Sequence, residues 1–222
     1  MSLRITYDKI ERKVARRLGY PLARTVRSED EQLSVDDAIC TGLRWFYFPT
    51  GDQSHEWSFV RRYNTIDLVV GQNWYELPAD FQRLASVAIV SYGNHPLSNT
   101  TEEGIRLRIT GEGLSGTPEY SSVRNKQVTH DTRYEIGVYP TPDREGTLSF
   151  WYMFAPETIS QQNPYPLGGE THGDTIIASV LAAAEAQQNP ELLGTEGSVH
   201  YQLFQQKLTN SIVTDMKQLG MV

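Results

Sequence analysis

Apolar residues recur every three or four positions near the start of the chain, a spacing that is typical of helices with one buried face. The first stripe ends at Gly19 and consists of Ile10, Val14 and Leu18. A second stripe follows Ser34, which forms a capping-box pattern with Asp37, and it stops by Pro49. Its members are Val35, Ala38, Ile39, Gly42, Leu43 and Phe46. The pattern therefore predicts two helices, the second of which begins at Ser34.

From about residue 57 the apolar period shortens to two, which is typical of β-strands. Ile66, Leu68 and Val70 alternate with more polar positions, "GQN" provides a turn, and "WYELP" would run back beside them. This segment therefore predicts a β-hairpin.

Further strands are predicted in the middle of the chain. "RLASVAIVSY" (83–92) would form one strand that ends at Gly93-Asn94, and a short arm would return beside it. A brief helix is expected over 98–107, with Ser98 or Asn99 as its cap. Three strands follow at about 119–129, 133–139 and 146–154. The last contains "TLSFWYMF", which is apolar at successive positions, so we expect a central strand that is covered on both faces.

Helical spacing returns after a Pro- and Gly-containing linker over 155–170. "DTIIASVLAAAEAQQ" (174–188) predicts a helix that ends at Asn189-Pro190, and its alanines would allow a neighbouring helix to approach closely. A last helix is predicted over about 196–218. Its apolar side would consist of Val199, Leu203, Leu208, Ile212, Met216 and Leu219.

This order of elements favours an α+β fold, because the strands are grouped instead of alternating with helices. We expect a helical domain made from both chain ends, residues 1–56 and 168–222. An antiparallel β-domain, sandwich or barrel-like, would be inserted with its linker as residues 57–167.

Charge is unevenly distributed along the chain. The net charge is -7, but residues 1–27 carry eight basic and two acidic side chains, so that this segment is +6 and the remainder is -13. An acidic body argues against a phosphate-binding groove over most of the surface. The basic charges of the first helix form a candidate partner interface, with a solvated face and nucleic-acid contact as alternatives. They are Lys9, Arg12, Lys13, Arg16 and Arg17.

Other motifs give weak signals for chemistry. Cys40 is the only cysteine and lies within a helical pattern, so we expect a small buried residue and no disulfide. "GEGLSG" (111–116) matches G-x-G-x-x-G, but Pro118 follows where a nucleotide-binding helix should begin. The histidines lack metal-ligand spacing; they are His55, His95, His130, His172 and His200. We expect neither a cofactor nor a metal, and no apolar run approaches the ~20 residues of a membrane span.

The segment "GQNWYELPADFQRL" (71–84) could be a sugar platform with an acid/base pair, Glu76 and Asp80. Trp74 and Tyr75 are adjacent on a predicted strand, so their side chains point to opposite faces and cannot share one platform. A carbohydrate-binding or hydrolytic tail component that uses Trp74, Glu76 and Asp80 stays open as an alternative function. A nucleic-acid-binding module that uses the basic helix is a second alternative.

Two strings carry a resemblance to a known family. The first is a V-x-G-x-x-x-Y-x-L-P-x-D-F-x-R-L pattern formed by Val69, Gly71, Tyr75, Leu77, Pro78, Asp80, Phe81, Arg83 and Leu84. The second is "YPTPD" (139–143), which precedes the aromatic strand. Taken in this order, with paired helices at the end, the segments resemble the head–tail adaptor proteins of tailed bacteriophages. That group includes the tail tubular protein of short-tailed phages.

The resemblance implies a structural virion protein without catalytic residues. It implies a ring of about a dozen copies between the portal protein and the tail components, through which DNA passes without specific binding. It implies a place in the neck or tail of the virion, with host cytoplasm as the location during assembly, from a phage or a prophage. The strongly basic first helix departs from the family pattern.

Overall fold

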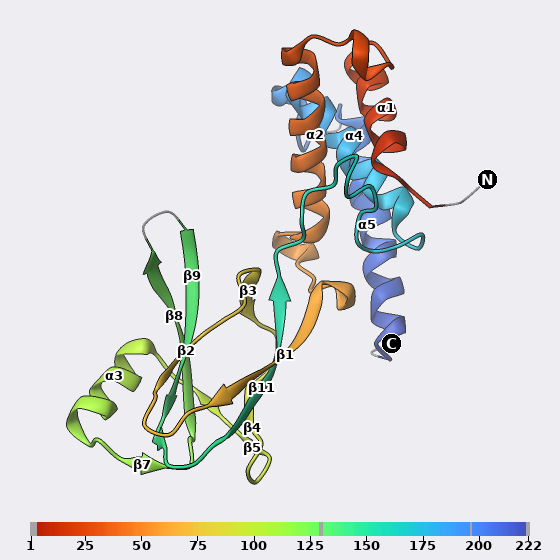
Figure 1. Ribbon diagram of the computed structural model, residues 1–222. Coiled ribbons are helices and arrows are strands. Elements are labelled where there is room, and N and C mark those ends of the chain that lie inside the picture. Colours follow the sequence, from red (N-terminus) through yellow and green to blue (C-terminus); the bar gives the residue numbers. More distant parts are fainter. Residues whose placement is uncertain (1–3, 129–130, 196, 221–222) are drawn as a thin grey trace. The chain divides into compact units, whose positions relative to one another are not determined.

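The computed structural model describes residues 4–128, 131–195 and 197–220 (Figure 1). The chain divides into two compact units, one made of Met1–Val60 with Glu157–Val222 and the other of Arg61–Pro156. Helices build the first unit and strands dominate the second, so the fold is α+β as the sequence predicts.

Four long helices lie in the part of the first unit that the structure describes. They are α1 (Tyr7–Leu18), α2 (Glu29–Tyr47), α4 (Gly173–Gln188) and α5 (Val199–Gln218). Short 3-10 turns accompany them: Arg24–Val26, Gly51–Gln53, Ser58–Val60 and Pro190–Leu192. Helix α4 packs against each of the other three, and its buried residues lie on nearly all sides. It is therefore the central helix of this unit.

The ends of α1 and α4 confirm the predicted boundaries. Gly19 follows α1 with a φ of 80°, a left-handed conformation in which glycine has no steric penalty, and Asn189 follows α4. The predicted start of α2 is wrong, because the helix begins at Glu29. Its capping box is made by Ser28 and Glu31, whereas Ser34 donates its hydroxyl to the Asp30 carbonyl inside the helix.

Helices α2 and α4 approach each other closely at Gly42. A Cβ added there would lie 2.6 Å from the Val180 nitrogen and 2.8 Å from the Ser179 carbonyl carbon. The alanine side chains of α4 are small, so they let another helix come close. Ala182, Ala183 and Ala184 are buried. The predicted close approach is thus present, and Gly42 is the residue that permits it.

Two predictions about helix faces are wrong. The buried side of α5 consists of Phe204, Leu208, Ser211 and Asp215. Val199, Leu203 and Leu219, which the pattern placed inside, are exposed. Cys40 is also exposed, because the neighbouring Ile39 occupies the core-facing position of α2. Periodicity found these helices, but it did not detect the polar partners that draw Ser211 and Asp215 inward.

The described residues of the second unit form eleven short or medium strands and one helix. The bounds are β1 (Arg61–Leu68), β2 (Trp74–Glu76), β3 (Phe81–Leu84), β4 (Ile89–Val90), β5 (His95–Pro96), β6 (Ser98–Asn99), α3 (Glu102–Gly111), β7 (Ser115–Gly116), β8 (Tyr120–Val128), β9 (Asp131–Tyr139), β10 (Thr141–Pro142) and β11 (Gly146–Phe154). The three predicted strands over 119–154 are confirmed as β8, β9 and β11.

These strands form open sheets, so the barrel-like alternative is wrong. One sheet has the order β1-β11-β4-β5 with β3 also on β11, and a second has the order β2-β9-β8-β6. Strands β7 and β10 form a separate pair, which is parallel, as is the pairing of β6 with β8. The remaining pairings are antiparallel. The two main sheets share an apolar core, in which Phe81 of β3 contacts Tyr134 of β9 and Tyr152 of β11.

The predicted hairpin around "GQN" is wrong. Strand β1 pairs with β11 over its whole length, from Arg61↔Met153 to Leu68↔Gly146, whereas β2 pairs with β9 in the other sheet. The turn itself is held by Tyr75, whose hydroxyl donates to the Gln72 carbonyl at 2.8 Å. "GQN" therefore connects two sheets instead of two neighbouring strands.

The strand predicted over 83–92 is interrupted. Its two parts, β3 and β4, both pair with the same edge of β11, and Ser86 lies between them and accepts from the Trp151 amide at 3.1 Å. The predicted returning arm is present as β5. Strand β11 is central as predicted, but it is not covered on both faces, since Trp151 is 48% exposed. Helix α3 begins later than predicted, with Thr101 as its cap.

Candidate functional site

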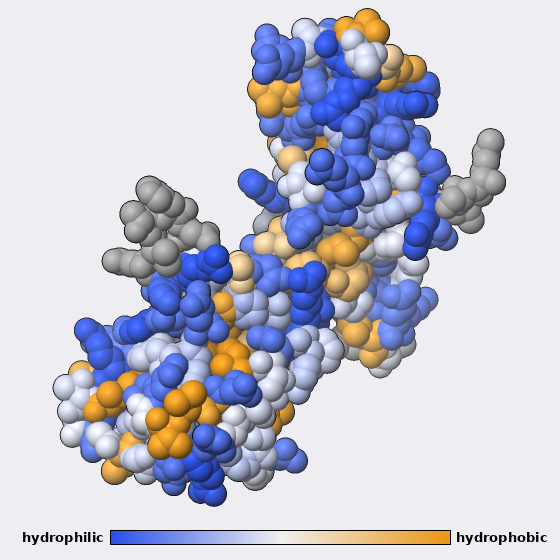
Figure 2. Space-filling model, viewed as in Figure 1, coloured by the Kyte–Doolittle hydropathy of each residue, from blue (hydrophilic) through white to orange (hydrophobic). Residues whose placement is uncertain are grey.

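The candidate partner interface lies on α1. Ile10, Val14 and Leu18 are buried, so the helix turns its basic residues outward. Lys9, Arg12, Lys13 and Arg16 are exposed and Arg17 is half-buried. In Figure 2, hydrophilic residues cover much of the surface where Figure 1 draws α1. The structure thus brings four of the five predicted residues to one exposed helix face.

The five basic residues differ in what they already contact. Arg17 lies 3.5 Å from Glu185 and donates to Gln188 at 2.7 Å, both on α4. Lys9 donates to the Arg4 carbonyl at 2.8 Å. In contrast, Arg12, Lys13 and Arg16 make no ion pair within the described part of the chain. These three are the residues of the set that are available to a partner.

A buried ionic cluster holds α1 against the loop that precedes α2. The Arg27 guanidinium is fully buried and lies 2.8 Å from Glu11, which is itself buried on α1. Arg27 also donates to the carbonyls of Pro21 and Leu22 and to the amide oxygen of Gln32. In the sequence Arg27 is only one of the eight basic residues of segment 1–27. Its role here is to fix the position of α1, and no local pattern marks it.

A second buried polar cluster, also missed, surrounds Asp215 on α5. Its carboxylate is fully buried, lies 2.8 Å from the His55 ring nitrogen, and accepts the Ser58 hydroxyl at 2.5 Å and the Ser58 amide at 3.1 Å. Burial raises the pKa of Asp215, but the bonds from Ser58 and His55 outweigh it and hold the pKa below its ordinary value. His172 lies nearby among aromatic rings, and burial lowers its pKa.

This cluster joins α5 to the segment that leads into β1. A carboxylate, two imidazoles and a hydroxyl could suggest a metal centre, but the described residues contain no group of three or more His, Cys, Asp or Glu that could hold a metal ion. His130 lies outside the described residues. The arrangement of His55, Ser58 and Asp215 is that of a buried structural clamp.

The residues of the possible acid/base pair lie in two different clusters. Glu76 is exposed and contacts Lys126 at 3.4 Å on the outer face of the β2-β9-β8 sheet. Asp80 pairs with Arg62 and accepts the Tyr152 hydroxyl at 3.0 Å. Each carboxylate is therefore engaged by its own cation, and the two do not form one acid/base pair.

The two adjacent aromatics also separate as predicted. Tyr75 is buried, whereas Trp74 lies against Gly137 and has the Arg124 guanidinium stacked over its ring at 3.7 Å. Arg124 in turn pairs with Glu135 at 2.9 Å. The exposed face of Trp74 is thus occupied by a cation–π contact from Arg124 of β8, the strand beyond β9 in this sheet.

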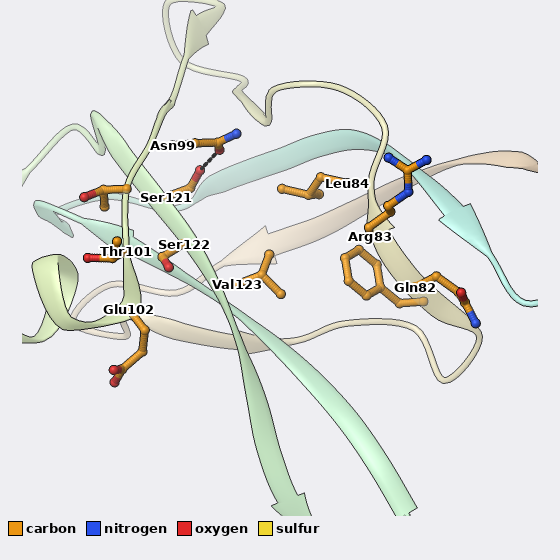
Figure 3. A pocket seen from close by; sticks show the side chains of 11 residues that line it. Gln82, Arg83, Leu84, Asn99, Thr101, Glu102, Ser121, Ser122 and Val123 are labelled. Atoms are coloured by element: carbon orange, nitrogen blue, oxygen red, sulfur yellow. Dashed lines mark hydrogen bonds between the residues drawn. The ribbon is translucent and has the colours of Figure 1, made fainter. Parts of the chain in front are cut away.

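A shallow pocket in the second unit was not predicted. Its volume is about 370 Å³, and Figure 3 shows Asn99, Thr101 and Ser121 on one side and Arg83 and Leu84 of β3 on the other. Ser121 donates to Asn99 at 3.2 Å, and Glu102 provides the only carboxylate of the lining. Such a lining of hydroxyl and amide groups lacks the paired acid and base, or the nucleophile and base, that catalysis requires.

Comparison with known proteins decides the family. A family model described as SU10 adaptor protein matches residues 5–220, which is nearly the whole chain. The chain belongs to the SU10 adaptor protein family. This is a phage head–tail adaptor family, so the resemblance drawn from the two strings is confirmed. A search of curated proteins finds no match.

Membership in the SU10 adaptor family gives the chain a structural role as a phage head–tail adaptor. Structural families of this kind are generally not enzymatic, and they suggest a location in the virion. Among the described helices none is both long enough and apolar enough to span a membrane. An adaptor family implies interaction with portal and tail proteins.

Proposed function

We propose that this adaptor forms a ring between the portal protein and the tail, through which DNA passes. The observation that supports this proposal is the family match over residues 5–220. A ring of identical subunits needs two different faces on each chain, since each copy contacts its neighbours head to tail. A helical unit and a strand-rich unit on the same chain offer such separate surfaces.

The charge distribution is compatible with DNA passage. Outside residues 1–27 the chain carries a net charge of -13, as the totals of +6 and -7 require. A channel that attracted phosphates would retain the DNA, whereas an acidic channel lets it slide. We propose that DNA meets the acidic part of the protein and makes no specific contact with it.

We also propose that the two compact units are the two domains predicted from the sequence, with the helical domain toward the portal and the β-domain toward the tail. The basic face of α1, with Lys9, Arg12, Lys13, Arg16 and Arg17, is proposed as a partner interface. This assignment rests on the exposure of four of these residues. During assembly the chain would be in the host cytoplasm, and in the virion it would be in the neck.

The test is reconstitution with the portal protein of the same phage. The purified chain should form closed rings, alone or on the portal, which electron microscopy and native mass spectrometry would count as about a dozen copies of a 25.2 kDa chain. A chain that forms no ring and ignores the portal would contradict the proposal. Binding of that chain to a glycan array would instead support the carbohydrate-binding alternative at Trp74.

A further inference from the structure

The exposed face of α1 carries like charges that repel one another. Residues four apart on a helix are neighbours, so Arg12 faces Arg16 and Lys9 faces Lys13. Such like-charge pairs destabilise a helix. Arg12, Lys13 and Arg16 make no ion pair with any described residue that would offset this cost. A basic face of this kind is stabilised when an acidic surface covers it.

The same unit presents an acidic face on α2. Glu29, Asp30 and Asp37 are exposed, and none forms an ion pair among the residues described. Glu29 and Asp30 lie in the first turn, where the helix dipole already favours acidic residues. Asp37 lies two turns further along the helix, where the dipole gives it no such stabilisation.

The two faces match in charge and in number. Among the described residues, three exposed cations on α1 and three exposed carboxylates on α2 form no ion pair. At 1.5 Å per residue, Arg12 to Arg16 spans about 6 Å of helix and Glu29 to Asp37 spans about 12 Å, so the acidic face is long enough to cover the basic one. The basic residues of α1 and the acidic residues of α2 do not pair with each other within one chain. They can form ion pairs with each other only when they belong to two different copies.

The acidic face also has the composition of an interface. Leu33 lies between Asp30 and Asp37 on α2 and is 59% exposed. An apolar centre with a charged rim is the usual anatomy of a protein–protein contact. Charged rims determine orientation and association rate more than affinity, and a ring needs a defined orientation between neighbouring copies.

We propose that the basic face of α1 docks on the acidic face of α2 of a second copy of this chain. Arg12, Lys13 and Arg16 of one copy pair with Glu29, Asp30 and Asp37 of the next, around Leu33. The contact is heterologous, so it repeats from copy to copy and is suited to closing a ring. This inference rests on the self-association in the proposed function and names the surfaces that make it.

The test is charge reversal with rescue. Arg12→Glu with Arg16→Glu makes an α1 variant, and Asp30→Lys with Asp37→Lys makes an α2 variant. Sedimentation velocity at low and high salt would measure association of each, because screening is weak at low ionic strength. The wild-type chain should give species above 25.2 kDa that salt dissociates. Each variant alone should associate at least tenfold more weakly.

Rescue distinguishes this contact from a general effect of charge. In an equimolar mixture, the now acidic α1 of one variant faces the now basic α2 of the other, so association should return to nearly the wild-type level. A single chain with all four substitutions should associate as well. Arg106→Glu with Lys217→Glu is the matched control, since it makes the same charge change at exposed sites elsewhere and should leave association unchanged.

Four results would overturn the proposal. Rings that form equally well with the α1 variant would refute this contact while leaving the proposed ring intact. A mixture that fails to rescue would refute the second copy as partner, and so would a wild-type chain that stays monomeric at low salt and high concentration both alone and with the portal protein. An α1 variant that loses retention of a DNA duplex in a gel-shift assay, with self-association unchanged, would assign the basic face to nucleic acid.

Discussion

Gly42 offers the sharpest test of the packing in the helical unit. The substitution Gly42→Ala adds a Cβ that would lie 2.6 Å from the Val180 nitrogen and 2.8 Å from the Ser179 carbonyl carbon. Both are backbone atoms of α4, so no side chain can rotate away. Helices α2 and α4 would have to separate by nearly 1 Å, since carbon contacts shorter than ~3.5 Å are repulsive.

The expected cost follows from two opposing effects. Overpacking in a well-packed core costs about 1–3 kcal/mol, and contact with backbone places this site near 3 kcal/mol. Alanine is favoured over glycine inside a helix by about 1 kcal/mol. The net loss in the free energy of unfolding should therefore be about 2 kcal/mol. With a urea m-value of about 2 kcal/mol/M, the midpoint should fall by about 1 M.

Urea unfolding followed by circular dichroism at the helical band would measure this shift. Gly111→Ala is the matched control, because an added Cβ at the end of α3 meets nothing within 4 Å and should not lower stability. A Gly42→Ala chain as stable as the wild type would refute the close approach. Recovery of its stability by Val180→Ala would also refute it, because that change removes no backbone atom.

Three further predictions concern charged residues. Arg27→Met should cost about 3–5 kcal/mol, because Glu11 would stay buried with only the longer 3.8 Å contact to Arg24, and adding Glu11→Leu should recover most of it, as urea unfolding of both variants would show. Asp215→Asn should cost about 1.5–3 kcal/mol at pH 7. The pKa of Asp215 is lowered in the folded state, so the ionised carboxylate contributes its full stabilisation at pH values above its ordinary pKa. This contribution disappears as the pH falls through the lowered pKa. The difference in free energy of unfolding between the wild type and Asp215→Asn should therefore vanish in strong acid. Glu76→Gln should change the free energy of unfolding by less than about 1 kcal/mol, since the ion pair of Glu76 with Lys126 is exposed. A larger loss would mean that the Glu76 carboxylate is needed to stabilise the fold.

The candidate interface was predictable from the sequence because it depends on local spacing. The apolar stripe at Ile10, Val14 and Leu18 fixes which side of α1 is buried, and the basic residues between these positions must then face outward. What spacing could not reveal is that Arg17 is already paired with Glu185 on α4, which lies far along the chain.

The positions of some helices and strands follow from the sequence alone, because the residues that define them lie within a few positions of one another. Gly19 ends α1, Asn189-Pro190 ends α4, and the alternating strands β8, β9 and β11 lie where their pattern predicts. The family strings are likewise local, and they gave the adaptor assignment before the fold was known. These features depend on backbone preferences and side-chain periods, which each segment carries by itself.

Only the tertiary structure decided which distant segments meet. Strand β1 pairs with β11 and not with β2, the next strand in the sequence. The pairing of strands depends on register and on which side chains become buried, and not on nearness in sequence. Arg27 and Asp215 could enter the interior only because Glu11 and the His55–Ser58 segment meet them there. A buried charge is stable only with its partner, and that partner exists only in the folded chain.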